Sequence, residues 1–145
     1  MSQDSSARQL VVFTLAGEQY ALPIGHVQEI IRYTPPRPVA SSDHWVRGVL
    51  NLRGRIVPVY DLASRLGINS EVNEHSKIVI IQTGSETTGV IVDEVDEVLT
   101  VDDEQFEPAP GADTTLIDSI AKVGERLVVL LAPTTIFAGA EMAAA

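Results

Sequence analysis

The sequence of 145 residues contains no cysteine, and its aromatic residues make up only 5% of the chain. Without cysteine the protein can form neither a disulfide framework nor a metal site that uses thiolates, so a reducing environment is expected. No segment approaches the run of about 20 apolar residues that a transmembrane helix needs. The first seven residues also lack the basic start and apolar run of a signal peptide. We therefore expect a cytoplasmic protein with no direct membrane insertion.

Basic residues are also scarce, because ten Lys and Arg stand against twenty Asp and Glu, giving a formal net charge of -10. This balance argues against nucleic acid or an anionic membrane as the main partner, since both select a basic surface. Residues 1–76 hold seven basic and seven acidic residues, whereas residues 77–145 hold three and thirteen. Eight of the acidic residues lie in the segment 93–107, which has no basic residue. This segment is either a partner surface or a solvated face.

The residue patterns of catalysis are missing as well. The segment 84–89 has the glycine spacing of a phosphate-binding loop, but Val90 and Ile91 stand where Lys and Ser or Thr are required. The three histidines never lie four residues apart, and no Gly-x-Ser-x-Gly sequence presents a nucleophile. The carboxylates of segment 93–107 lack the spacing and central glycine of a calcium loop. We predict that the protein is not an enzyme and needs no metal and no cofactor.

What the sequence does contain is a series of short apolar segments typical of β-strands, with enough hydrophobic residues, 45%, for a sizeable core. Strands are predicted at 10–15, 19–22 and 27–33. Two further runs, 49–52 and 56–60, flank the turn Arg53-Gly54-Arg55 and predict a β-hairpin. Asp61 is suited to cap a short helix over 62–66 that ends at Gly67.

The second half of the chain repeats the first. Residues 11–17 match 78–84, residues 26–31 match 94–99, and residues 54–59 match 124–129 with one residue inserted after the glycine. Short segments rich in Val and Ile can resemble one another by chance, but here the same ordered set occurs twice. We predict an all-β protein with two similar lobes, 9–67 and 77–133, each of about five strands closed as a small barrel. A C-terminal helix is expected from about residue 133 to 140.

The segment 46–62, Val-Arg-Gly-Val-Leu-Asn-Leu-Arg-Gly-Arg-Ile-Val-Pro-Val-Tyr-Asp-Leu, closely resembles the signature of the CheW family of bacterial chemotaxis coupling proteins. The resemblance covers residues 9–137, nearly the whole chain. It implies one domain of two tandem five-stranded SH3-like β-barrels with short connecting helices. It also implies a non-catalytic adaptor, monomeric in isolation, that couples methyl-accepting chemoreceptors to the regulatory domain of the histidine kinase CheA in membrane-associated arrays.

In the family, the helical hairpin at the receptor tip lies in a groove between the lobes. Apolar residues there would bury the tip at roughly 25 cal/mol per Å² of apolar surface, and an arginine and a glutamate would fix its register through charged hydrogen bonds. The competing interpretation is that the arginine is a solvated turn charge and the valines are core residues. Carried over to this sequence, the groove is lined by Val27, Glu29, Gly48, Arg53, Ile78, Val95 and Val98.

Two other functions stay open at this point. A similar adaptor could serve a chemosensory array with a different output, such as twitching or surface sensing, and the receptors found with it would separate the two cases. A two-barrel protein that binds a small molecule is the candidate from a different class, because apolar clefts between lobes also hold ligands. Stabilisation by a ligand without receptor or kinase binding would favour that function.

Overall fold

The computed structural model describes residues 7–138, and most of them lie in β-strands. The strands predicted from the sequence are confirmed, as is the short helix, whose first turn is capped by Asp61 Oδ1 accepting from the Ser64 N–H at 3.2 Å. The elements in chain order are β1 (Ala7–Leu15), β2 (Glu18–Pro23), the 3-10 turn η1 (Ile24–His26), β3 (Val27–Arg32), β4 (Val46–Leu52), β5 (Arg55–Asp61), α1 (Leu62–Arg65), β6 (Lys77–Thr83), β7 (Glu86–Val92), β8 (Glu94–Asp102), the 3-10 turn η2 (Asp103–Gln105), β9 (Phe106–Glu107), β10 (Ile117–Val123) and β11 (Arg126–Leu131).

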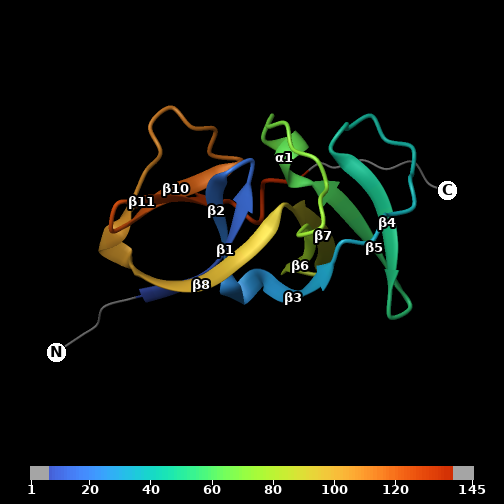
Figure 1. Ribbon diagram of the computed structural model, residues 1–145, viewed down its shortest axis with the longest axis horizontal. Coiled ribbons are helices and arrows are strands. Elements are labelled where there is room, and N and C mark those ends of the chain that lie inside the picture. Colours follow the sequence, from blue (N-terminus) through green and yellow to red (C-terminus); the bar gives the residue numbers. More distant parts are fainter. Residues whose placement is uncertain (1–6, 139–145) are drawn as a thin grey trace.

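The strands form two sheets that lie next to each other along the long axis of the molecule (Figure 1). Sheet A has the strand order β8-β1-β2-β11-β10-β9, and sheet B has the order β3-β6-β7-β5-β4. Neighbouring strands are antiparallel except for β2 with β11 and β5 with β7, which are parallel. The prediction of an all-β fold is therefore confirmed, and the two sheets of six and five strands are consistent with the two small five-stranded barrels that were expected.

The repeat in the sequence is visible in these sheets, but the sheets are not the two halves of the chain. The first-repeat strands β1, β2, β3, β4 and β5 correspond to the second-repeat strands β6, β7, β8, β10 and β11. If every strand of sheet B (β3-β6-β7-β5-β4) is exchanged for its counterpart, the result is the order of sheet A without β9, β8-β1-β2-β11-β10. Apart from the extra strand β9 in sheet A, each sheet thus contains the first hairpin of one repeat and three strands of the other. The division into lobes at 9–67 and 77–133 is wrong for the sheets, because a repeat does not reveal which copy a strand pairs with.

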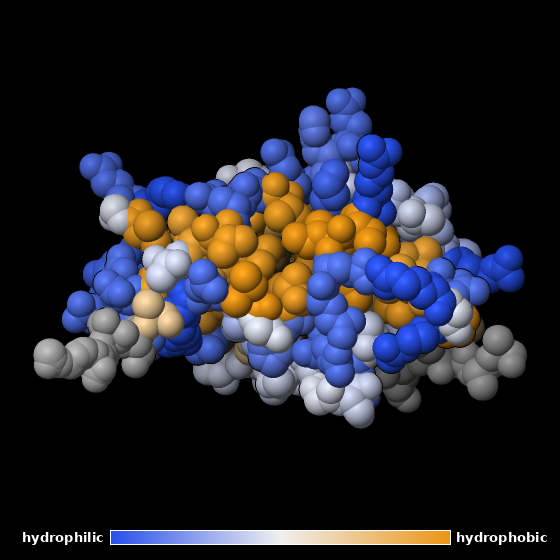
Figure 2. Space-filling model, turned by 90° about the horizontal axis from the view of Figure 1, so that it is seen from below, coloured by the Kyte–Doolittle hydropathy of each residue, from blue (hydrophilic) through white to orange (hydrophobic). Residues whose placement is uncertain are grey.

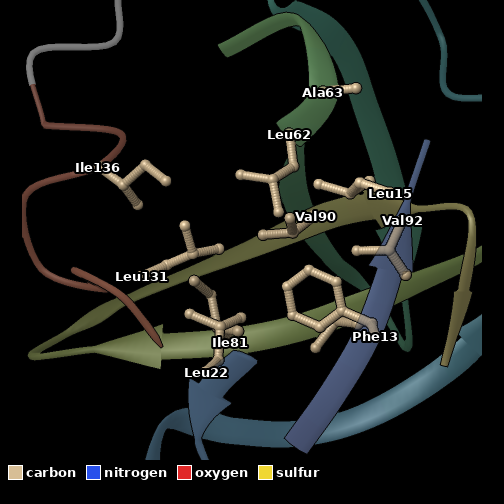
Figure 3. Close-up of a cluster of buried hydrophobic side chains, with 11 residues drawn as sticks. Phe13, Leu15, Leu22, Leu62, Ala63, Ile81, Val90, Val92, Leu131 and Ile136 are labelled. Carbon is tan, nitrogen blue, oxygen red and sulfur yellow. The ribbon is translucent and has the colours of Figure 1, made fainter. Parts of the chain in front are cut away.

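A shared hydrophobic core joins the two sheets. Its side chains come from β1, β2 and β11 of sheet A, from β6 and β7 of sheet B, from α1, and from the turns after β11 (Figure 3). Smaller clusters fill each sheet separately, one around Leu10 and Val128 in sheet A and one around Val59 and Ile80 in sheet B. The buried members of the shared core are Phe13, Leu15, Leu22, Leu62, Ala63, Val79, Ile81, Val90, Val92, Leu131 and Ile136.

The expected C-terminal helix is not present over residues 133–138, which form successive turns. Tertiary contacts compete with helix formation there, because Ile136 O accepts from Arg65 Nε at 2.6 Å and Thr135 Oγ1 donates to Thr115 O at 2.9 Å. The turns place Phe137 against Trp45 and Tyr60, with ring centroids 5.6 and 4.7 Å apart. The rest of the expected helix lies outside the described residues.

The shared core predicts that both sheets unfold together. Leu22→Ala removes a sheet A side chain that is 2% exposed, and we expect it to cost roughly 2–5 kcal/mol of unfolding free energy. Trp45, the single tryptophan, packs on Tyr60 of sheet B, so its fluorescence reports the other sheet. Fluorescence and circular dichroism should give the same reduced urea midpoint.

The matched control is Leu127→Ala, which truncates a leucine that is 61% exposed and should change stability by less than about 0.5 kcal/mol. A Leu22→Ala variant that loses only part of its β signal while Trp45 fluorescence keeps its original midpoint would contradict the shared core.

Candidate functional site

The edge strands β3 and β8 form one exposed apolar face. Val27 on β3 and Val95 on β8 occupy equivalent positions of the repeat, and both are half-buried against the shared core. Ile30 and Val98 are the next equivalent pair, with exposed fractions of 40% and 52%. On this side of the molecule an apolar band crosses the surface between hydrophilic borders (Figure 2). We call this surface, with Ile24 of η1, the β3/β8 face.

A β-bulge at the same place in each repeat shapes this face. The two-residue step from Val27 to Glu29 lies opposite a single step of β6, and the step from Val95 to Glu97 lies opposite a single step of β1. A bulge bends its strand and redirects the side chains near it. The extra residue in β8, Asp96, accepts a hydrogen bond from Thr14 Oγ1 at 2.7 Å, which fixes the bulge to β1.

Glu29 and Arg53 form a two-point ion pair at the β3 end of the face. Arg53 Nη1 donates to Glu29 Oε2 at 2.6 Å, and Nη2 donates to Oε1 at 2.5 Å. Arg53 lies in the turn between β4 and β5, so it connects one edge of sheet B to the other edge strand, β3. The hydrogen bonds from Arg53 hold the pKa of Glu29 below its usual value and raise the pKa of Arg53. Arg53 is therefore more than a freely solvated turn charge.

The turn that carries Arg53 is a two-residue hairpin turn in which both central residues have positive φ, +51° at Arg53 and +85° at Gly54. The equivalent turn between β10 and β11 also has two residues, since Val123 pairs with Arg126 as Leu52 pairs with Arg55. The expected one-residue insertion is therefore absent. Arg53 corresponds to Gly124, which has a similar positive φ of +64°. Arg55 corresponds to Arg126.

A second ion pair lies at the β8 end of the face. Arg126 Nη2 donates to Glu97 Oε2 at 2.6 Å, and Arg126 Nε donates to Gln19 Oε1 at 3.1 Å. Glu97 is the repeat equivalent of Glu29. Both ends of the face thus carry a carboxylate held by an arginine from the opposing hairpin.

Two residues expected in the groove lie elsewhere. Ile78 has no exposed surface and packs in the sheet B core, so it supports the face from behind and cannot contact a partner. Gly48 is buried on β4, where an added Cβ would lie 2.0 Å from Arg37 O. The close backbone approach that Gly48 permits is thus made by the protein itself, through the paired hydrogen bonds between Arg37 and Val49.

Comparison with known proteins identifies the family. A family model described as a CheW-like domain matches residues 9–141. The chain belongs to the CheW family. The chemotaxis protein CheW of Klebsiella aerogenes is 30% identical over 148 residues, which cover 99% of this chain and 89% of the relative. CheW of Bacillus subtilis is 34% identical over 85% of this chain and 82% of its own.

A solved structure shares the fold as well. The scaffolding protein TtCheW from Thermoanaerobacter tengcongensis superposes with a TM-score of 0.86 at 32% identity, covering 92% of this chain and 94% of that chain. Protein PilI of Pseudomonas aeruginosa is 34% identical over a shorter stretch, 57% of this chain and 47% of its own. As a CheW family member the protein is a chemotaxis adaptor, and the β3/β8 face is its candidate interaction site.

Sequence reasoning missed Ile24 and Ile30, although both are exposed apolar residues of the face. Ile30 could have been predicted, because the repeat aligns it with Val98, which was among the predicted groove residues. Ile24 lies in η1, between the strands that the repeat matches, so only the folded structure reveals it.

Most of the acidic segment 93–107 is engaged within the protein. Asp93 accepts from the Ala16 N–H at 2.8 Å and from Ser70 Oγ at 2.5 Å, so it joins β8 to the β1–β2 turn. Asp103 pairs with Arg8, and Glu107 pairs with Lys122. These carboxylates are engaged in ion pairs and hydrogen bonds within the protein and are not a uniform solvated surface.

Other kinds of site have little support within residues 7–138. No group of three His, Asp or Glu side chains there could hold a metal ion, and no helix there is long and apolar enough to cross a membrane. An open pocket of about 350 Å³ has a polar lining, unlike the apolar cleft expected for a small ligand. It is lined by Arg32, Tyr33, Asn73, Glu74, Ser76 and Lys77.

The ion pair predicts the titration of Glu29. Its pKa is lowered in the folded protein, so the pair stabilises the fold fully above the usual glutamate pKa of about 4.3 and loses that effect as the pH falls through the lowered value. In Arg53→Gln, the carboxyl resonance of Glu29 followed by NMR should titrate closer to the usual pKa. Arg55→Gln, the control in the same turn, should leave it unchanged. Equal titration of Glu29 in wild type and Arg53→Gln would exclude the pair in solution.

Gly48 gives a prediction of stability. Gly48→Ala places a Cβ against Arg37 O at a φ of +143°, and we expect a loss of at least about 2 kcal/mol in urea unfolding. Gly25→Ala is the control, because no atom lies within 4 Å of its added Cβ and its φ is not positive. If both variants had the same midpoint, the contact between Gly48 and Arg37 would be absent in solution.

Proposed function

We propose that the protein is a non-catalytic adaptor that binds the cytoplasmic tip of chemoreceptors through the β3/β8 face and couples it to the regulatory domain of a CheA-type histidine kinase. The observation that carries this proposal is the exposed apolar band on two edge strands, bordered at each end by an arginine–glutamate pair. Receptor binding would recruit the protein to arrays at the membrane.

A helical hairpin suits this face on physical grounds. An amphipathic helix presents apolar residues at intervals of three and four positions, and it binds where a groove or strip offers apolar side chains of similar length. Val27 and Val95 form the half-buried floor, and Ile30 and Val98 project from either half. The polar borders would set the register and reject partners of the wrong charge.

The conformation of Arg53 supports a role in binding. A positive φ is unfavourable for a residue with a side chain, and glycine would adopt it more easily. The guanidinium is nevertheless held by Glu29, with the Arg53 side chain still 68% exposed. An exposed arginine fixed in one orientation loses less conformational entropy when it binds a partner.

The kinase would bind a separate surface, since coupling requires that receptor and kinase are bound at the same time. The output of the array is a further question. The relatives named chemotaxis protein CheW cover most of this chain, whereas the similarity to PilI covers little more than half, which favours chemotaxis over twitching or surface sensing. Catalysis and small-molecule binding have no comparable support.

The proposal predicts that Arg53→Gln weakens binding to a receptor signalling fragment by roughly tenfold in calorimetry, because a charged hydrogen-bonding group at the border of the face is lost. The thermal melt should stay within a few degrees of wild type. Lys122→Gln, which removes another exposed, ion-paired cation far along sheet A, is the control. Binding to the kinase regulatory domain should be unchanged in both variants.

Reconstitution tests the coupling itself. Wild-type protein added to receptor and kinase should place autophosphorylation under receptor control, and Arg53→Gln should need a higher concentration to do so. A folded Arg53→Gln variant with wild-type receptor affinity, together with a Val98→Asp variant that also binds normally, would refute the assignment of the β3/β8 face.

A further inference from the structure

The β3/β8 face is built twice. The segments 26–31 and 94–99 match in the sequence, each begins an edge strand, and each contains a bulge at the same step. The half-buried valines, the exposed Ile30 and Val98 and the paired glutamates all obey the same correspondence. The face therefore has an approximate two-fold relation between a β3 half and a β8 half.

The arginines of the two ion pairs, Arg53 and Arg126, do not occupy equivalent positions of the repeat. Glu29 is held by Arg53 from within its turn, whereas Glu97 is held by Arg126, the first residue of β11. The residue equivalent to Arg126 is Arg55, whose Nη2 donates to Thr87 Oγ1 at 3.4 Å. Two different positions in the hairpins thus produce the same carboxylate–guanidinium group at both ends of the face.

The Glu97–Arg126 pair is as open to a partner as its counterpart. The exposed fractions of the two side chains are 41% and 42%, compared with 28% and 68% for Glu29 and Arg53. Gln19 and Asp96 join the pair in a continuous network, because Arg126 Nε donates to Gln19 and Gln19 Nε2 donates to Asp96. The side chains are thus oriented before any partner arrives.

We propose that Glu97 and Arg126 form a second specificity-determining ion pair of the receptor-binding face, and that the charge difference between the halves sets the direction in which the receptor's helical hairpin lies. This inference rests on the proposed function of the face. It adds a contact to the site and a reason for its orientation.

The β3 half and the β8 half of the face carry different charges at equivalent positions of the repeat. A face with perfect two-fold symmetry would accept the same partner in two opposite directions with equal affinity. The β8 half carries Glu94, Asp96 and Glu97 against Arg126. The β3 half carries only Glu29 against Arg32 and Arg53. The apolar side chains of the two halves also differ, at Ile24 and at Ile30 against Val98. The charges of the two halves have opposite net sign, so we assign the selection of direction to them.

Charge complementarity therefore defines the occupant. The helical hairpin should place its more basic end on the β8 half and its more acidic end on the β3 half. Because these charges are exposed, their effect should weaken in high salt, where the Debye length falls to about 3 Å at 1 M.

The first test compares arginine variants in binding to the receptor signalling fragment. Arg126→Gln should weaken binding about as much as Arg53→Gln, roughly tenfold, while Lys122→Gln binds like wild type. If Arg53→Gln is weakened and Arg126→Gln is not, the second pair is refuted and the proposed function stands. If neither is weakened in a folded protein, the second pair is refuted, and normal binding by Val98→Asp as well would refute the proposed role of the β3/β8 face.

A charge reversal separates recognition from structure. The double variant Glu97→Arg with Arg126→Glu can re-form an ion pair, so a purely structural pair would regain both wild-type stability and wild-type binding. We expect the melting temperature to recover toward that of the wild type while receptor affinity stays reduced. Recovery of both would overturn the recognition role.

The direction can be tested by disulfide cross-linking, because the protein has no cysteine of its own. Thr100→Cys, at the outer end of the β8 half, should cross-link to receptor fragments with a cysteine at one end of the tip region and not at the other. The further changes Glu94→Gln and Asp96→Asn remove much of the charge difference and should allow both cross-links. Equal cross-linking of both ends before those changes, or an unchanged single direction after them, would overturn the proposal.

Discussion

The exchange of first hairpins between the two repeats is the constraint on which the rest of the structure depends. The β1–β2 hairpin completes the sheet that β8, β10 and β11 form, and the β6–β7 hairpin completes the sheet of β3, β4 and β5. The two parallel pairings, β2 with β11 and β5 with β7, are the seams of this exchange. Because the chain must cross from one sheet to the other directly before β3 and again before β8, both strands begin beside the shared core. The candidate binding face, the β3/β8 face, is therefore located at the crossing.

This location explains why the face is both apolar and exposed. An exposed edge strand is prone to pair with other chains, and proteins limit this with bulges and charged residues. Both devices are present here, since each strand has a bulge next to a paired glutamate. They discourage extension of the sheet while leaving the valines and Ile30 available. A partner that covers the side chains without adding a strand, such as a helix, fits these conditions.

The sequence predicted the strands, the Arg53 turn and the Asp61 cap because each depends on local residue preferences. The exchange was not predictable, since Val11 and Ile78 are equally good strand residues and nothing local shows which copy β3 will join. Ile78 was misplaced for a related reason: a continuous apolar strand does not reveal which side chains lie inside. The C-terminal helix failed because a distant side chain, Arg65, occupies the Ile136 carbonyl. The ion pairs depend on the meeting of distant strands; the family resemblance named Glu29 and Arg53 as groove residues but did not pair them with each other.

The repeat and the charge distribution have separate roles in the face. Duplication supplies the same backbone twice, so bulges, valines and glutamates recur with little new sequence. A single direction of receptor binding requires a difference between the two halves of the face. Two equivalent backbone segments cannot supply that difference. Side-chain charge can, because replacing His26 and Gln28 by their counterparts Glu94 and Asp96 changes the potential of one half without moving its strand. The acidic excess of the second half of the chain thus acts in two ways, since its carboxylates accept hydrogen bonds within sheet A and also distinguish one end of a nearly symmetric surface from the other.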